Sequence, residues 1–229
     1  MQMIMAILSV ALLMSIDEAS AQSTYSASVS RHASVPPLSE ADVRKILVDA
    51  SKMLQKDSVS KEDTDVACNV TFSLKGPVRT FGAPGTSTNI VDEQHRDAVH
   101  KIDSDVAGVD FHVKVVKEIK FCRPGLTETS FDGCSFPIDF RSIIVVHPSE
   151  HRDTLSKSSK YPDHLLWAHE FGHLTGLGHR HSSSALMTSC SVASLASLSR
   201  VQVNKEECRC LLGGPGSCPL PGALSCQPQ

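Results

Sequence analysis

Apolar residues recur every three or four positions in several segments of the chain, and this spacing predicts helices. The first helix runs from Glu40 to Leu54, with an apolar stripe of Leu38, Val43, Ile46, Leu47, Ala50 and Leu54. The second is capped by Asn89 and continues to about Val106. A last helix from about Leu198 to Leu212 closes the domain.

Alternating apolar and polar residues predict strands in the intervening segments. Residues 66–74 have strand character, and the clearest alternation lies between Phe111 and Phe121. There one face of the strand is expected to be buried and the other solvent-exposed. The face expected to be solvent-exposed, or wet, is formed by Asp110, His112, Lys114, Glu118 and Lys120. Residues 143–146 form a continuous apolar run, which is typical of a strand covered on both faces.

The richest chemistry lies in residues 169–179, which read His-Glu-Phe-Gly-His-Leu-Thr-Gly-Leu-Gly-His. On a helix, His169 and His173 are one turn apart on the same face, so both imidazoles can reach one metal ion. Gly176 permits the left-handed break that a helix needs before His179 can supply a third nitrogen. Three nitrogens with an open fourth position are typical of catalytic rather than structural zinc.

This pattern resembles the metzincin clan of zinc peptidases, in which H-E-x-x-H-x-x-G-x-x-H is followed by a methionine-containing turn. Met187 lies in such a turn, Ser184-Ala185-Leu186-Met187-Thr188, eight residues after His179. The resemblance covers about twenty residues and is most matrixin-like around the motif. Two positions differ from the branches of the clan: Arg180 follows the third histidine, and Ser189 replaces the tyrosine that astacins and serralysins place after the methionine. The branch therefore stays open.

The resemblance implies an α+β fold with an α/β-type upper sheet, which is twisted and mostly parallel. An active-site helix, a Met-turn and a C-terminal helix complete this metzincin-like zincin domain. It implies Zn²⁺ held by His169, His173 and His179, with Glu170 as the general base toward water and Met187 packed beneath the histidines. The expected activity is that of a zinc metalloendopeptidase acting on protein or peptide substrates.

The N-terminal residues have the features of a secretory signal peptide, residues 1–21. Residues 4–14 are an apolar run too short to cross a bilayer, and Ala19-Ser20-Ala21 is a small-x-small cleavage site. Residues 22–63 are interpreted as a propeptide of a zymogen or as an N-terminal extension, and residues 64–229 as the catalytic domain. We therefore expect a secreted monomer without stable membrane insertion.

Eight cysteines agree with an oxidising compartment and predict a disulfide framework. Cys122 and Cys134 bracket a loop that a bridge would close. Cys68 is interpreted as a disulfide partner, with a thiolate switch as the alternative. The four cysteines from 208 to 226 lie in a Gly- and Pro-containing tail, residues 208–229, and are expected to bind it to the last helix or to Cys190.

Composition limits the partners of the protein. Twenty-two basic and 25 acidic residues give a net charge of −3, without a basic patch that would indicate nucleic-acid binding. Two alternatives to an endopeptidase stay open: a non-catalytic zinc-binding or inhibitory module on a peptidase fold, and a metal-dependent exopeptidase with Arg180 or Arg200 as the clamp for a chain terminus. Asn69-Val70-Thr71 is a glycosylation sequon.

Overall fold

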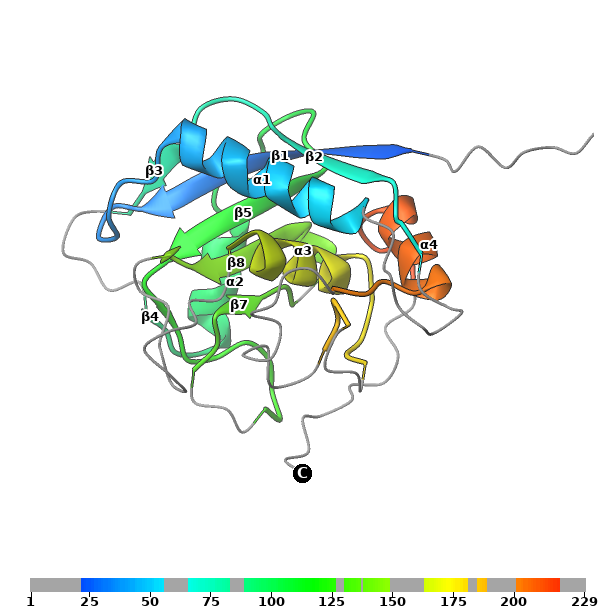
Figure 1. The fold of residues 1–229 in the computed structure, drawn as a ribbon. Helices are drawn as coiled ribbons and strands as arrows, with labels where there is room; N and C mark the ends of the chain where they lie inside the picture. Colours follow the sequence, from blue (N-terminus) through cyan, green and yellow to red (C-terminus); the bar gives the residue numbers. More distant parts are fainter. Residues whose placement is uncertain are drawn as a thin grey trace, which may run out of the picture.

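The centre of the fold is a six-stranded sheet with the strand order β2-β1-β5-β8-β7, in which β3 also pairs with β1 (Figure 1). The computed structural model describes residues 22–55, 66–82, 89–126, 130–136, 138–148, 163–180, 185–188 and 201–218. All pairs in this sheet are parallel except β7 with β8, so the expectation of a mostly parallel sheet is confirmed. Its strands are β1 (Ser23–His32), β2 (Val70–Leu74), β3 (Arg79–Phe81), β5 (Phe111–Val116), β7 (Gly133–Cys134) and β8 (Ser142–Val146).

Strand β1 lies inside the sheet, which the sequence did not indicate. Residues 23–27 pair with β2, and residues 27–31 pair with β5. Segments on both sides of the expected boundary at residues 63 and 64 thus pair within one sheet. The parallel pairing of β1 with both neighbours places the N-terminal segment at the middle of the fold.

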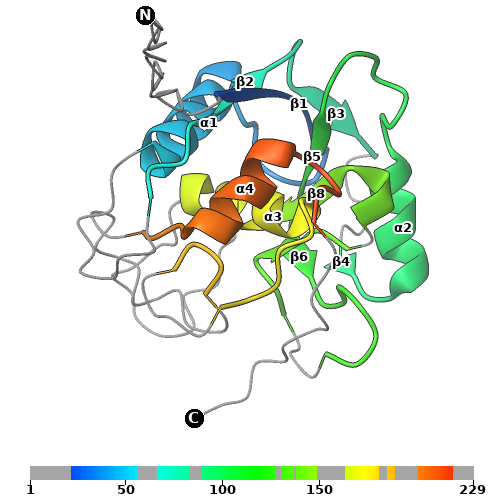
Figure 2. The same ribbon diagram turned by 90° about the vertical axis from the view of Figure 1, so that its right-hand side faces the viewer.

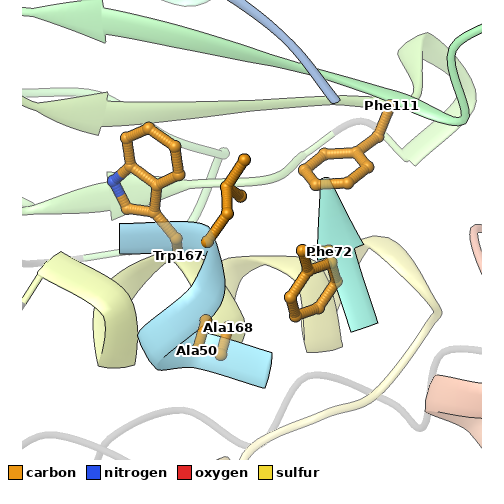
Figure 3. Close-up of a pocket in the computed structure, with 6 residues that line it drawn as sticks. Ala50, Phe72, Phe111, Trp167 and Ala168 are labelled. Atoms are coloured by element: carbon orange, nitrogen blue, oxygen red, sulfur yellow. The ribbon is translucent and has the colours of Figure 1, made fainter. Parts of the chain in front are cut away.

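Helices α1 (Glu40–Leu54) and α3 (Asp163–Leu174) cover one face of the sheet (Figure 1). The bounds of α1 agree with the prediction, because the Ser39 side chain caps its first turn and its apolar stripe faces the core. Figure 3 shows where the two helices meet the sheet, at Ala50 and Ala168 beside Trp167, Phe72 and Phe111. The two alanines allow a close approach of α1 to α3, which fixes α3 against the sheet.

The opposite face of the sheet is polar near β1 and β5, yet it is buried, and partners for it come from the segment that follows α2 (Glu93–Lys101), a helix that itself packs on β8. Ser28 Oγ lies 2.7 Å from His112 Nδ1, Ser30 donates to Asp103, and Lys114 donates to a backbone carbonyl at residue 102. The prediction of a wet face was therefore wrong for His112 and Lys114, because a central strand is covered from both sides. Desolvation lowers the pKa of His112 to about 4 and that of Lys114 to about 8.

Two helix starts differ from the predictions. Helix α2 begins at Glu93 behind the cap Asp92, because Asn89 and Ile90 form strand β4, which pairs with β6 (Glu118–Ile119). Helix α4 (Lys205–Gly213) begins later than residue 198, with Asn204 as its cap. Residues 198–200 lie outside the described residues. The continuous apolar strand β8 is covered on both faces, as predicted.

Three disulfides connect the described residues: Cys68–Cys208, Cys122–Cys134 and Cys210–Cys218. The predicted bridge across residues 122–134 and the disulfide interpretation of Cys68 are confirmed. Cys208 and Cys210 belong to α4, within the range predicted for the last helix. Cys190, Cys226 and the proposed signal peptide lie outside the described residues, and within the described ones no helix has the length and apolar character needed to span a membrane.

Candidate metal centre

Three histidines converge at the carboxyl end of α3. His169 and His173 lie on one face of the helix with their ring centroids 4.7 Å apart, and His179 arrives from the segment after it. The three ligand nitrogens lie within 4.8 Å of one another. His173 Nε2 and His179 Nε2 are 3.0 Å apart. The structure thus brings together the three residues that the sequence proposed as ligands.

The turn to His179 depends on Gly176, whose φ of 99° is unfavourable for residues with a side chain. The Gly176 amide donates to the His173 carbonyl at 2.9 Å, and the next amide reaches back to Gly172 at 3.0 Å. A Cβ atom at residue 176 would also overlap the Cys218 carbonyl oxygen. The chain therefore turns at a glycine two residues after the end of α3, as the sequence predicted from its backbone conformation, and packing against Cys218 requires the glycine as well.

The orientation of two imidazoles is set by backbone carbonyls. His169 Nδ1 donates to the Leu186 carbonyl at 2.7 Å, and His173 Nδ1 donates to the Leu177 carbonyl at 2.8 Å. This leaves the Nε2 atom of each ring as the donor for a metal ion. Burial lowers the pKa of both side chains, so the rings are neutral at physiological pH, as ligands must be. Two rings oriented in this way, together with the nearby His179, offer three imidazole nitrogens that fit a zinc ion.

Glu170 is buried between α3 and β7. Its carboxylate accepts a hydrogen bond of 2.5 Å from Ser135 Oγ, and the same hydroxyl lies 2.8 Å from the Glu170 carbonyl oxygen. Gly133 makes room for the carboxylate, since a Cβ atom there would overlap it. Burial raises the pKa of Glu170 to about 8; the Ser135 hydrogen bond opposes this shift and the nearby Asp132 adds to it. A divalent cation at the adjacent histidines would favour the carboxylate form.

Met187 is fully buried, and its sulfur lies against Gly172, which directly precedes His173 on the helix. Its turn is held from both sides. The Arg180 amide donates to the Met187 carbonyl at 2.6 Å, and the Leu186 amide donates to the Gln202 carbonyl at 2.9 Å. The methionine thus packs directly on the helix that carries His169 and His173.

Three residues of the site were not found from the sequence. Gly133 and Ser135 belong to the β7 region and contact Glu170, and Glu207 of α4 pairs with the Arg180 guanidinium at 3.1 Å. All three act through contacts between segments that are 27 to 37 residues apart. The small residues around Cys134 carried no pattern that could have indicated these contacts.

The fold and site together define a mixed α/β protein with a three-histidine metal centre on a helix behind a mostly parallel sheet. No protein-family model matches the chain, and no curated protein matches its sequence.

Among solved structures, the chain is similar to archaemetzincin from Methanopyrus kandleri, with 13% identity, a TM-score of 0.47 and coverage of 82% of this chain and 93% of that one. It is also similar to a zinc-dependent peptidase from Methanocorpusculum labreanum, with 14% identity, a TM-score of 0.47 and coverage of 81% of this chain and 99% of that one. A third similar structure is metalloproteinase-II from Bacteroides fragilis, with 16% identity, a TM-score of 0.43 and coverage of 82% of this chain and 52% of that one. The site is therefore interpreted from its own residues.

Proposed function

We propose that the protein is a secreted zinc-dependent endopeptidase. The observation that carries this proposal is the convergence of His169, His173 and His179, whose ligand nitrogens lie within 4.8 Å of one another, beside a buried glutamate on the same helix. Two backbone carbonyls fix the rings, and this preorganisation is typical of a metal site rather than of solvated histidines.

The chemistry divides between the ion and the chain. Zinc, when bound, polarises the scissile carbonyl and lowers the pKa of a water molecule. Glu170 accepts the proton of the attacking water and later delivers it to the leaving amine. Ser135 holds the carboxylate at 2.5 Å, and Gly133 leaves the space that the carboxylate occupies. No serine or cysteine nucleophile is needed, because water attacks directly.

The position of β7 supports a peptide as the substrate. This strand ends the main sheet and runs antiparallel to β8. Gly133 of β7 lies against the Glu170 carboxylate. An extended peptide that adds to the outer edge of β7 would carry its backbone past Glu170, and this mode of binding selects peptides over other amides.

The environment of Arg180 favours an endopeptidase over an exopeptidase. A clamp for a substrate terminus needs a charged group directed to the substrate, whereas the Arg180 guanidinium pairs with Glu207 and donates to the Gln202 carbonyl at 3.3 Å. The other candidate, Arg200, lies outside the described residues.

Secretion is supported by two independent features. The N-terminal apolar run and its cleavage site have the order of a signal peptide. The disulfides Cys68–Cys208, Cys122–Cys134 and Cys210–Cys218 fit an oxidising compartment.

The test is the cleavage of a mixed, end-blocked peptide library by the purified secreted protein, mapped by mass spectrometry, with zinc content measured in parallel. We expect one zinc ion per chain and internal cuts that disappear with a chelator and in Glu170→Ala, which should keep its zinc. Cuts only in a library with free termini would identify an exopeptidase. Bound zinc without any cleavage would instead support the non-catalytic module.

A further inference from the structure

We propose that Arg180 and Glu207 form a positioning pair that holds the third metal ligand, His179, in place from helix α4. The inference rests on the proposed zinc site and assigns a role to a residue at which the chain differs from the metzincin branches. It also makes the metal affinity of the protein depend on a helix that contributes no ligand.

The need for such a pair follows from where the ligands lie. His169 and His173 belong to α3, so helical hydrogen bonds fix their backbone. His179 follows the end of the helix in an irregular segment. An irregular segment has no hydrogen-bond ladder, and its position depends on anchors at its ends. Gly176 is the anchor on one side, and Arg180 is the first residue on the other.

Arg180 makes three contacts that together fix the position of the segment. Its amide donates to the Met187 carbonyl at 2.6 Å, and its guanidinium donates to the Gln202 carbonyl at 3.3 Å. The guanidinium also pairs with Glu207 at 3.1 Å, where the arginine side chain is 22% and the glutamate side chain 7% exposed. A partly buried ion pair is screened less than a surface pair, so it can hold a loop in one position.

Glu207 is a fixed point for this pair. It is the third residue of α4. Its backbone N–H donates to the Asn204 side-chain oxygen at 2.8 Å, and its carboxylate accepts a hydrogen bond from the backbone N–H of Asn204 at 2.9 Å. The next residue, Cys208, is bound to Cys68. Helix α4 lies beside α3 (Figure 2). The carboxylate thus connects the cap of α4 to the segment that carries His179.

The experiment compares zinc affinity, measured by chelator competition, in the full secreted protein and in Arg180→Ala, Glu207→Gln and the double variant. Glutamine at residue 207 can keep the capping interaction while it removes the charge. Loss of contacts outside the ligand set typically weakens metal binding by about 10- to 100-fold, and we expect this range for both single variants. The double variant should bind zinc no more weakly than Arg180→Ala, because each single change already removes the same Arg180–Glu207 interaction. Excess zinc should restore kcat.

Asn204→Ala is the matched control, since it removes the side-chain cap of α4 but keeps both the backbone N–H of residue 204 that donates to the Glu207 carboxylate and the Arg180–Glu207 pair. We expect it to lower the melting temperature without changing zinc affinity. Wild-type zinc affinity in Glu207→Gln, or an affinity that follows the melting temperature across all variants including Asn204→Ala, would overturn the inference. A wild-type protein that binds no zinc would overturn the proposed function itself, which separates the two failures.

Discussion

At the scale of single residues, the position of the Glu170 carboxylate depends on the absence of a side chain at Gly133. Gly133→Ala would place a Cβ atom where Glu170 now lies, at a position without a positive φ, so the cost is steric. We expect kcat to fall by about 10- to 100-fold, the loss typical of a misplaced catalytic group, while zinc content stays at the wild-type level. Steady-state kinetics with metal analysis checks this, and an unchanged kcat would contradict the packing argument.

Ser135→Ala is the companion change, because it removes the hydrogen bond to Glu170 without adding volume. We expect a smaller loss of kcat than in Gly133→Ala, since the carboxylate keeps its space but loses one donor. The same kinetic assay compares the two variants directly. If Ser135→Ala were the more damaging change, the hydroxyl rather than the cavity would determine the position of the base.

The sequence could predict the ligands of this site but not their supports. His169, His173 and Gly176 follow from helix geometry, which acts over a few residues. The contact of Ser135 with Glu170 and that of Arg180 with Glu207 join segments far apart in the chain. Such contacts depend on how the elements pack, and no local pattern records them.

At the scale of elements, the same division between local and distant causes explains which predictions were correct. Helix α1 was predicted with its bounds because Ser39 and the apolar stripe act within the helix. Strand β1 was missed because its pattern is weak: Tyr25, Ala27 and Val29 are buried, but so are Ser28, Ser30 and His32, and the burial comes from its pairing with β2 and β5 in the sheet. The polar face of β5 was predicted to be solvent-exposed for the same reason, since the partners of its side chains come from β1 and from the segment after α2.

Two buried histidines, His100 of α2 and His112 of β5, predict acid sensitivity. Burial lowers the pKa of both His100 and His112 to about 4, below the value of about 6.5 that unfolded histidine has. Between these values the unfolded state binds more protons, so stability falls as the pH decreases from about 6.5 to 4, by up to roughly 3 kcal/mol for each group. Denaturant titrations across this range should give a shallower pH dependence for His100→Gln and His112→Gln than for the wild type. Equal slopes in all three proteins would contradict this assignment.

At the scale of the whole molecule, the disulfide Cys68–Cys208 closes a loop over a sequence separation of 140 residues and joins the segment before β2 to α4. Loss of a bridge of this kind typically costs 2–5 kcal/mol, chiefly because the unfolded chain gains freedom. We expect the variant Cys68→Ala/Cys208→Ala to be destabilised by about that amount in denaturant unfolding. The pair Cys210→Ala/Cys218→Ala, which spans 8 residues, should lose less stability. A larger loss of stability after removal of the shorter bridge would show that strain or local contacts, rather than loop length, determine how much each disulfide stabilises the protein.

The internal position of β1 has a consequence for how the protein could be activated. A propeptide can be removed only if the remainder keeps its fold, and a chain that starts at residue 64 lacks the strand between β2 and β5 together with α1. Loss of β1 would expose the backbone groups of β2 and β5 that now pair with it, and loss of α1 would open the core that this helix covers. We therefore expect residues 64–229 expressed alone to be unfolded by circular dichroism, and the chain from Gln22 to be folded and able to bind zinc. A stable 64–229 fragment with greater peptidase activity than the longer chain would contradict this expectation and would show that residues 22–63 are a propeptide.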